Sequence, residues 1–241
     1  MRRLSWVVLL AACGGSEKKE IERPEPEPEE QSAHKAPPPD DEDASDMKVE
    51  GLLGQLQPSE IQPVIEMRWR DIEECYRDNI GKNRFVGGHV ELKFRVFKDG
   101  KVKTVFIADG DLGSWPVERC VLAIANAISF PPPTPRGHEA EFGFPIDFPG
   151  RGSVNILAES GSDGELQPKF PLLAKCEGKA PAKVRVTSYT GPGGQVKSAG
   201  FVSPEGPLDE AWAECAYEKA LSWKLTDPRG KVVKASSWYA P

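Results

Sequence analysis

The sequence predicts an α+β protein built from two small units, each in the order α-β-β-α-β, with the second unit degenerate. Three observations indicate this fold class. Some segments repeat apolar residues at helical spacing, and others alternate apolar and polar residues around glycine turns, as β-hairpins do. The same succession, with cysteines at matching places, occurs twice after residue 50. We therefore expect two small antiparallel sheets, each backed by helices.

The first residues have the layout of a bacterial export signal. Arg2 and Arg3 precede a short apolar stretch that ends in the letters LAAC at Cys13. A helix over residues 4–12 would rise only about 13 Å, far less than a hydrocarbon core of about 30 Å, so no permanent membrane span is expected. The last four residues resemble a lipobox, which implies that 1–12 is a lipoprotein signal peptide and that Cys13 carries the lipid, such as palmitate. An ordinary cleaved signal with an incidental cysteine is the alternative.

Residues 13–48 hold the lipidated cysteine and a linker rich in proline and acidic residues. Such a segment has little apolar surface to bury, so it is expected to be a disordered, extended tether. Residues 17–50 carry 13 acidic and 5 basic side chains, whereas residues 51–241 carry 24 of each sign. This balance gives no support for nucleic-acid binding by the folded part. An acidic partner-binding segment is the alternative to a simple spacer.

The first unit is expected over residues 49–150. A helical pattern begins near Ser59, which would form a capping box with Gln62. Alternation then predicts a hairpin around the turn at Asp99-Gly100. The expected elements are a helix over 58–80, hairpin strands within 89–110, a helix over 117–128 and a strand over 138–148.

The second unit, residues 151–241, repeats this pattern from its middle onward. Its expected elements are strands over 182–190 and 195–203, a helix over 208–223 and a closing strand over 231–239. When the helix cysteines are aligned, residues 128–130 fall on residues 223–225 without a gap. The long first helix is replaced by residues 153–173, of which only the letters SVNILAE have a strand-like pattern.

Besides Cys13, the chain has four cysteines, one before the hairpin and one in the following helix of each unit. The repeat favours pairing Cys75 with Cys120 and Cys176 with Cys215, and an exported chain meets an oxidising compartment. The rival interpretations are a metal site and a reactive thiol pair. The chain lacks the cysteine spacings typical of either.

Several motifs of the first unit resemble the TonB-like C-terminal domains of the AgmX/PglI type, found in envelope proteins of myxobacteria. The helix ends in Cys75-Tyr76, a strand begins Gly88-His89-Val90, and a Glu-x-Cys helix matches Glu118 and Cys120. The resemblance covers about residues 51–148 well and 174–239 weakly. It implies a small antiparallel sheet backed by two helices and a protein-interaction role in the periplasm. Energy-coupling TonB proteins keep a membrane helix, which the lipobox at Cys13 would remove.

The favoured function is a non-catalytic module that binds other envelope proteins, with a strand added at a free sheet edge. The closing strands, 139–148 and 231–239, are the expected edges, and Glu141 is the position for a backbone-blocking proline. A basic row could receive an acidic partner, although a plain solvated face is the alternative for it. The residues of this row are Lys93, Arg95, Lys101 and Lys103.

Two other functions stay open: a structural spacer or self-assembling envelope subunit, and an enzyme acting on the cell wall. No catalytic motif supports the enzyme. His34, His89 and His138 are scattered, so we expect no metal, no cofactor and no small-molecule substrate. Gly14 stands where an inner-membrane retention aspartate would be, which favours the outer membrane.

Overall fold

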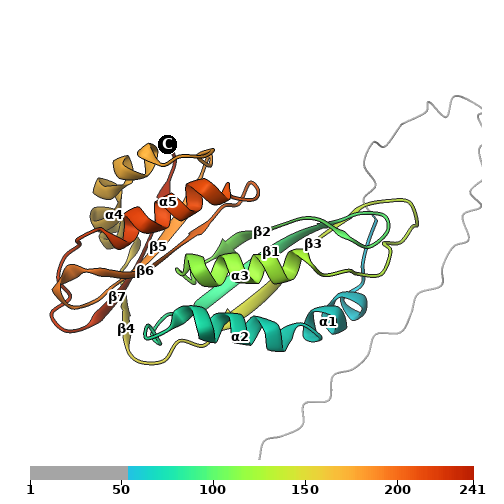
Figure 1. Ribbon diagram of the computed structural model, residues 1–241, viewed down its shortest axis with the longest axis horizontal. Helices are drawn as coiled ribbons and strands as arrows, with labels where there is room; N and C mark the ends of the chain where they lie inside the picture. Colours follow the sequence, from blue (N-terminus) through green and yellow to red (C-terminus); the bar gives the residue numbers. More distant parts are fainter. Residues whose placement is uncertain (1–53) are drawn as a thin grey trace, which may run out of the picture. The chain divides into compact units, whose positions relative to one another are not determined.

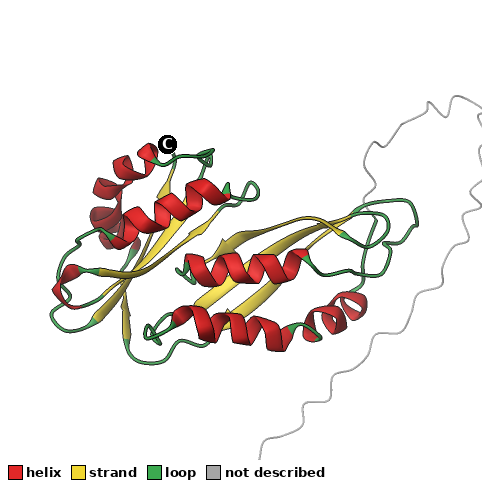
Figure 2. Cartoon of the chain, viewed as in Figure 1, coloured by secondary structure: helices red, strands yellow, loops and turns green. Residues whose placement is uncertain are grey.

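The structure is a computed structural model that describes residues 54–241. The described parts of both predicted repeats lie in a single compact unit. The expected α+β class is confirmed, because helices pack on two small sheets (Figures 1 and 2). The predicted lipidation site Cys13, with its signal peptide and linker, lies outside the described residues.

The first repeat forms a three-stranded antiparallel sheet in the order β2-β1-β3. Helices α2 and α3 run side by side over one face of it (Figure 1). Its elements are α1 (Pro58–Glu66), α2 (Trp69–Ile80), β1 (Gly88–Val96), β2 (Val102–Gly110), α3 (Trp115–Asn126) and β3 (Ala140–Phe148).

The alternation predicted for β1 is confirmed. Four apolar side chains on one face are buried, whereas the charged side chains between them face the other way and stay partly or fully exposed. Burying this apolar face against the helices supplies the hydrophobic free energy that stabilises the layer. The buried residues are Val90, Leu92, Phe94 and Val96.

The single helix predicted over 58–80 is wrong, because the chain breaks between α1 and α2. The N–H of Arg68 donates to the carbonyl of Ile65, three residues back, at 2.9 Å. This tighter bond ends α1 and turns the chain before α2 begins. The predicted capping box is also misplaced, since the N–H of Gln57 donates to the carboxylate of Glu60 at 2.8 Å.

The second repeat forms a four-stranded sheet in the order β4-β7-β5-β6. This sheet is mixed and not purely antiparallel, because the short β4 pairs parallel to β7. Its elements are β4 (Val154–Ile156), α4 (Glu159–Leu166), the 3₁₀ helix η1 (Gln167–Lys175), β5 (Val184–Thr190), the short η2 (Pro192–Gly194), β6 (Val196–Val202), α5 (Glu210–Leu221) and β7 (Val232–Tyr239).

The two repeats match at the end of the hairpin turn. In the first, the N–H of Phe130 donates to the carbonyl of Gly100 at 2.8 Å. In the second, the N–H of Leu225 donates to the carbonyl of Gly194, also at 2.8 Å. Both glycines have positive φ, 90° and 74°, which favours glycine at both places. This agreement confirms the predicted superposition of residues 128–130 on 223–225.

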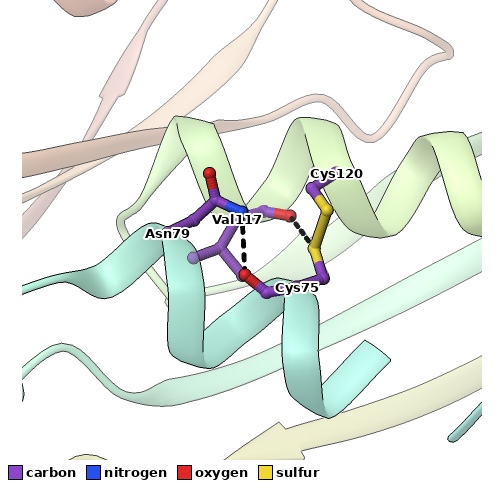
Figure 3. Close-up of a disulfide and its surroundings, with 4 residues drawn as sticks. All are labelled: Cys75, Asn79, Val117 and Cys120. Carbon is purple, nitrogen blue, oxygen red and sulfur yellow. Dashed lines mark hydrogen bonds between the residues drawn. A yellow bond between two sulfur atoms is a disulfide. The ribbon is translucent and has the colours of Figure 1, made fainter. Parts of the chain in front are cut away.

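Each repeat contains one disulfide, in the pairing that the repeat predicts. Cys75 on α2 joins Cys120 on α3, with their Cα atoms 6.1 Å apart (Figure 3). Cys176, just after η1, joins Cys215 on α5 at 5.5 Å. Beside the first disulfide, the amide of Asn79 donates to the carbonyl of Cys75 at 2.8 Å. In both repeats the bond therefore holds the central helix to the segment that precedes the hairpin.

The two hydrophobic cores exchange residues across the repeat boundary. Trp115, the first residue of α3, packs in the core of the second repeat, where its ring lies 6.4 Å from that of Phe201. Conversely, Tyr189 and Val202 of the second repeat belong to the core of the first. Because each core needs residues of the other repeat, the two repeats are expected to unfold together.

Candidate partner-binding site

Strand β3 lies at the edge of its sheet, as the sequence predicts. Within the described residues it pairs along its length only with β1. One isolated contact covers the start of the edge, where the N–H of Gly54 donates to the carbonyl of Glu139 at 2.6 Å. The rest of the strand leaves backbone groups available for an added strand.

The outward backbone groups of β3 can be assigned from two residues. The carbonyl of Glu139 faces Gly54, on the side away from β1. Pro145 has no N–H, and proline in a strand is tolerated where that group would point away from the neighbouring strand. Because backbone direction alternates along a strand, Gly143 and Asp147 also point their N–H groups outward. Pro145 interrupts this row, which limits edge-to-edge aggregation.

The second predicted edge, the closing strand over 231–239, is wrong. Strand β7 is internal, because β5 pairs with one of its sides and β4 with the other. The short segment Val154–Ile156 thus covers Val232–Lys234, the start of the edge that the repeat leaves open in β3. Among residues 54–241, only the first repeat keeps its closing strand as the terminal strand of a sheet.

A groove lies between α2 and the end of β3, with a volume of about 410 Å³. We refer to it as the α2–β3 groove. The Tyr76 hydroxyl ties its walls together, because it lies 2.7 Å from the carbonyl of Val86 and 3.0 Å from that of Pro149. The apolar lining consists of Trp69, Ile72, Tyr76, Ile80, Phe148 and Pro149, and the charged lining of Glu73, Arg77, Arg84, Asp147 and Arg151.

The predicted basic row does not form a free positive surface. Glu141 on β3 accepts from Lys93 at 2.7 Å and from Arg95 at 3.1 Å, and its hydrogen bond with Lys93 contributes most to lowering its pKa. These three residues line a hollow of about 260 Å³ against the loop over residues 204–207. The structure therefore brings three of the five predicted partner-binding residues together, with two cations sharing one carboxylate and a net charge of +1.

The other two members of the row lie apart from this hollow. Lys103 pairs with Glu139 at 2.8 Å, and Lys101 pairs with Asp99 in the hairpin turn at 3.5 Å. Each cation of the row thus has a carboxylate partner within its own sheet or turn. The charge available to an acidic partner is correspondingly small.

The Glu-x-Cys motif in the sequence does not reveal that Glu118, on α3, is the most deeply buried charged residue among residues 54–241. Its carboxylate accepts from the N–H of Ser114 at 3.1 Å and from the N–H of Phe201, in the other repeat, at 2.8 Å. Gly200 makes room for it, because a Cβ there would clash with the carboxylate. Burial raises the pKa of Glu118 to about 7, although the N–H groups around it act in the opposite direction.

Further polar contacts join the two repeats along their boundary. The buried ammonium of Lys234 on β7 lies 2.7 Å from the carboxylate of Asp111. Arg185 on β5 pairs with Asp109 at 2.7 Å, and the Trp115 indole donates to Glu214 at 2.9 Å. These pairs fix the two repeats to each other in one orientation, since each requires a specific alignment of both partners.

The described residues contain no group of three or more histidine, cysteine, aspartate or glutamate side chains that could hold a metal ion. The Nδ1 atom of His89 lies 3.2 Å from the carboxylate of Asp111, which also pairs with Lys234.

Among residues 54–241, none of the helices is long and apolar enough to cross a membrane.

The open edge of β3 and the α2–β3 groove together form the candidate site, and both belong to the first repeat. Comparisons of the chain with protein-family models, with curated proteins and with solved structures give no match.

Proposed function

We propose that this protein is a lipid-anchored, non-catalytic interaction module of the bacterial cell envelope. Cys13 would hold it on the membrane, with the outer membrane favoured, and the acidic segment up to residue 48 would act as the spacer. The folded repeats would bind other envelope proteins. The observation that carries this proposal is the open edge of β3 beside the α2–β3 groove.

An extended peptide is the ligand that suits the open edge of β3. An added strand would gain hydrogen bonds from the outward groups of Gly143 and Asp147, and its side chains would alternate between the two faces of the sheet. A strand bound at this edge would run beside the α2–β3 groove, which Asp147 also lines. The neutral charge balance of residues 51–241 makes a nucleic acid a poor partner.

Position 143 offers a sharper test than Glu141, whose replacement would also remove two ion pairs. Gly143→Pro should abolish partner recovery from envelope extract, because it removes an outward N–H. Gly143→Ala is the matched control, since it keeps the N–H and its Cβ meets only the mobile end of Glu91. Recovery should stay at the wild-type level with alanine, measured by quantitative pull-down of the oxidised protein.

Circular dichroism and thermal melting would establish that both variants at position 143 are folded. If folded Gly143→Pro recovers the same partners as Gly143→Ala, the edge of β3 is not the binding element. Recovery of further copies of this chain alone would favour the alternative function, a self-assembling envelope subunit.

A further inference from the structure

Two arginines that line the α2–β3 groove have no acidic partner within residues 54–241. Arg84 follows α2 and Arg151 follows β3, and the backbone N–H of Arg151 donates to the carbonyl of Arg84 at 2.6 Å. Both side chains are exposed, and neither forms a salt bridge within residues 54–241. Adjacent like charges repel, and a bound anion would relieve that repulsion.

The charged side chains that line the groove have a net charge of +1. Arg77 is engaged with Glu74 at 3.6 Å and with Asp78 at 3.7 Å. The carboxylate of Glu73 accepts from the indole of Trp69 at 2.9 Å. These contacts do not change the charge of the lining itself, because the indole is neutral and Glu74 and Asp78 lie outside it. Three arginines therefore stand against two acids, Glu73 and Asp147.

The remainder of the groove is apolar and aromatic. Trp69 is 36% exposed, a large apolar surface for a side chain on the outside of a helix. The ring of Tyr76 lies 5.0 Å from that of Phe148, and its hydroxyl is already bound to backbone carbonyls. This part of the groove is therefore a rigid apolar surface that suits an aromatic or aliphatic side chain.

We propose that the α2–β3 groove binds an acidic segment of a partner protein, with carboxylates at Arg84 and Arg151 and an apolar side chain against Trp69 and Tyr76. A guanidinium matches a carboxylate in a planar, two-point contact, which suits this pair to acidic side chains or a chain terminus. The inference rests on the proposed function, because it names the chemistry of the protein segment bound beside β3.

The test uses the full oxidised chain and a fluorescently labelled ten-residue peptide with two glutamates flanking one phenylalanine. Binding is measured by fluorescence anisotropy. The double variant Arg84→Gln/Arg151→Gln should weaken binding roughly 10-fold, the effect of two partly exposed charge contacts. Lys82→Gln, which removes an exposed cation outside the groove, should leave the affinity unchanged. A control peptide carries glutamine in place of both glutamates. Its affinity for the wild type should equal the affinity of the acidic peptide for the double variant.

Equal affinity of wild type and the double variant for the acidic peptide would overturn the proposal. So would binding of phosphatidylglycerol vesicles through the two arginines without any binding of the peptide, which would assign the groove to lipid phosphate. Partner recovery by Gly143→Pro and Gly143→Ala tests the β3 edge separately. If Gly143→Pro loses the partner and Gly143→Ala keeps it, but the arginine variants bind the acidic peptide as wild type does, the β3 edge remains the binding element. Only the chemistry assigned to the groove is then wrong.

Discussion

Replacing Glu118 with alanine is expected to lower the free energy of unfolding by about 4 kcal/mol at pH 5. The change would leave the buried N–H groups of Ser114 and Phe201 without acceptors, and each costs about 1–3 kcal/mol when unpaired. It would also open a cavity at the boundary between the repeats. Urea unfolding followed by tryptophan fluorescence would measure the loss.

The free energy of unfolding of the wild type should also depend on pH because of Glu118. The pKa of Glu118 is raised to about 7 in the folded protein from an ordinary value of 4.5, so the folded state holds a proton that the unfolded state releases. The contribution of Glu118 to the free energy of unfolding is therefore fully present below pH 4.5, and it is lost as the pH rises through 7. The raised pKa corresponds to about 3 kcal/mol between these limits.

Glu118→Gln has no proton to release, so its stability should lack this fall between pH 4.5 and 7. Glu218→Ala, an exposed acid on α5, is the matched surface control and should keep both the stability and the pH profile of the wild type. A Glu118→Gln profile parallel to that of the wild type would show that Glu118 does not titrate in this range.

Removing either disulfide should cost about 4 kcal/mol, because each closes a long loop in the unfolded chain. The sequence separations are 45 for Cys75–Cys120 and 39 for Cys176–Cys215, so the two losses should be similar. The paired variants Cys75→Ala/Cys120→Ala and Cys176→Ala/Cys215→Ala would be compared in urea.

Because the cores exchange Trp115, Tyr189 and Val202, each disulfide variant should unfold in a single transition. Free thiols counted without reductant should be absent among these four cysteines. Two well-separated transitions, with only the altered repeat destabilised, would contradict the shared core. Four reactive thiols in the unreduced mature protein would contradict the disulfides themselves.

The sequence predicts local features of this fold better than long-range ones. The β1 alternation, the turn at Gly100 and the cysteine pairing all follow from patterns within a short window or from the repeat. Helix α4 was missed because Gly161 and Gly164 are poor helix formers, and the helix instead gains stability by packing against β7. The strand-like pattern of residues 153–159 is confirmed by β4, but its parallel pairing with β7, which makes β7 internal, depends on a long-range contact.

The candidate site was only partly predictable for the same reason. The edge position of β3 follows from its place at the end of a short repeat, but the pairing of Lys93 and Arg95 with Glu141 depends on strand register. The α2–β3 groove joins residues that lie far apart in the sequence, such as Arg84 and Arg151. The repeat alignment places Ala213 of α5 opposite Glu118 of α3. This contrast is a usable signal that the acid on α3 has a role that its counterpart in the second repeat lacks.

The most direct test of the proposed binding module is hydrogen exchange of its β3 amides with and without a recovered partner. Binding by strand addition predicts slower exchange at Gly143 and Asp147, whose N–H groups point outward, and no change in the internal strand β7. Unchanged exchange at both β3 amides in the saturated complex, with protection elsewhere, would contradict the account.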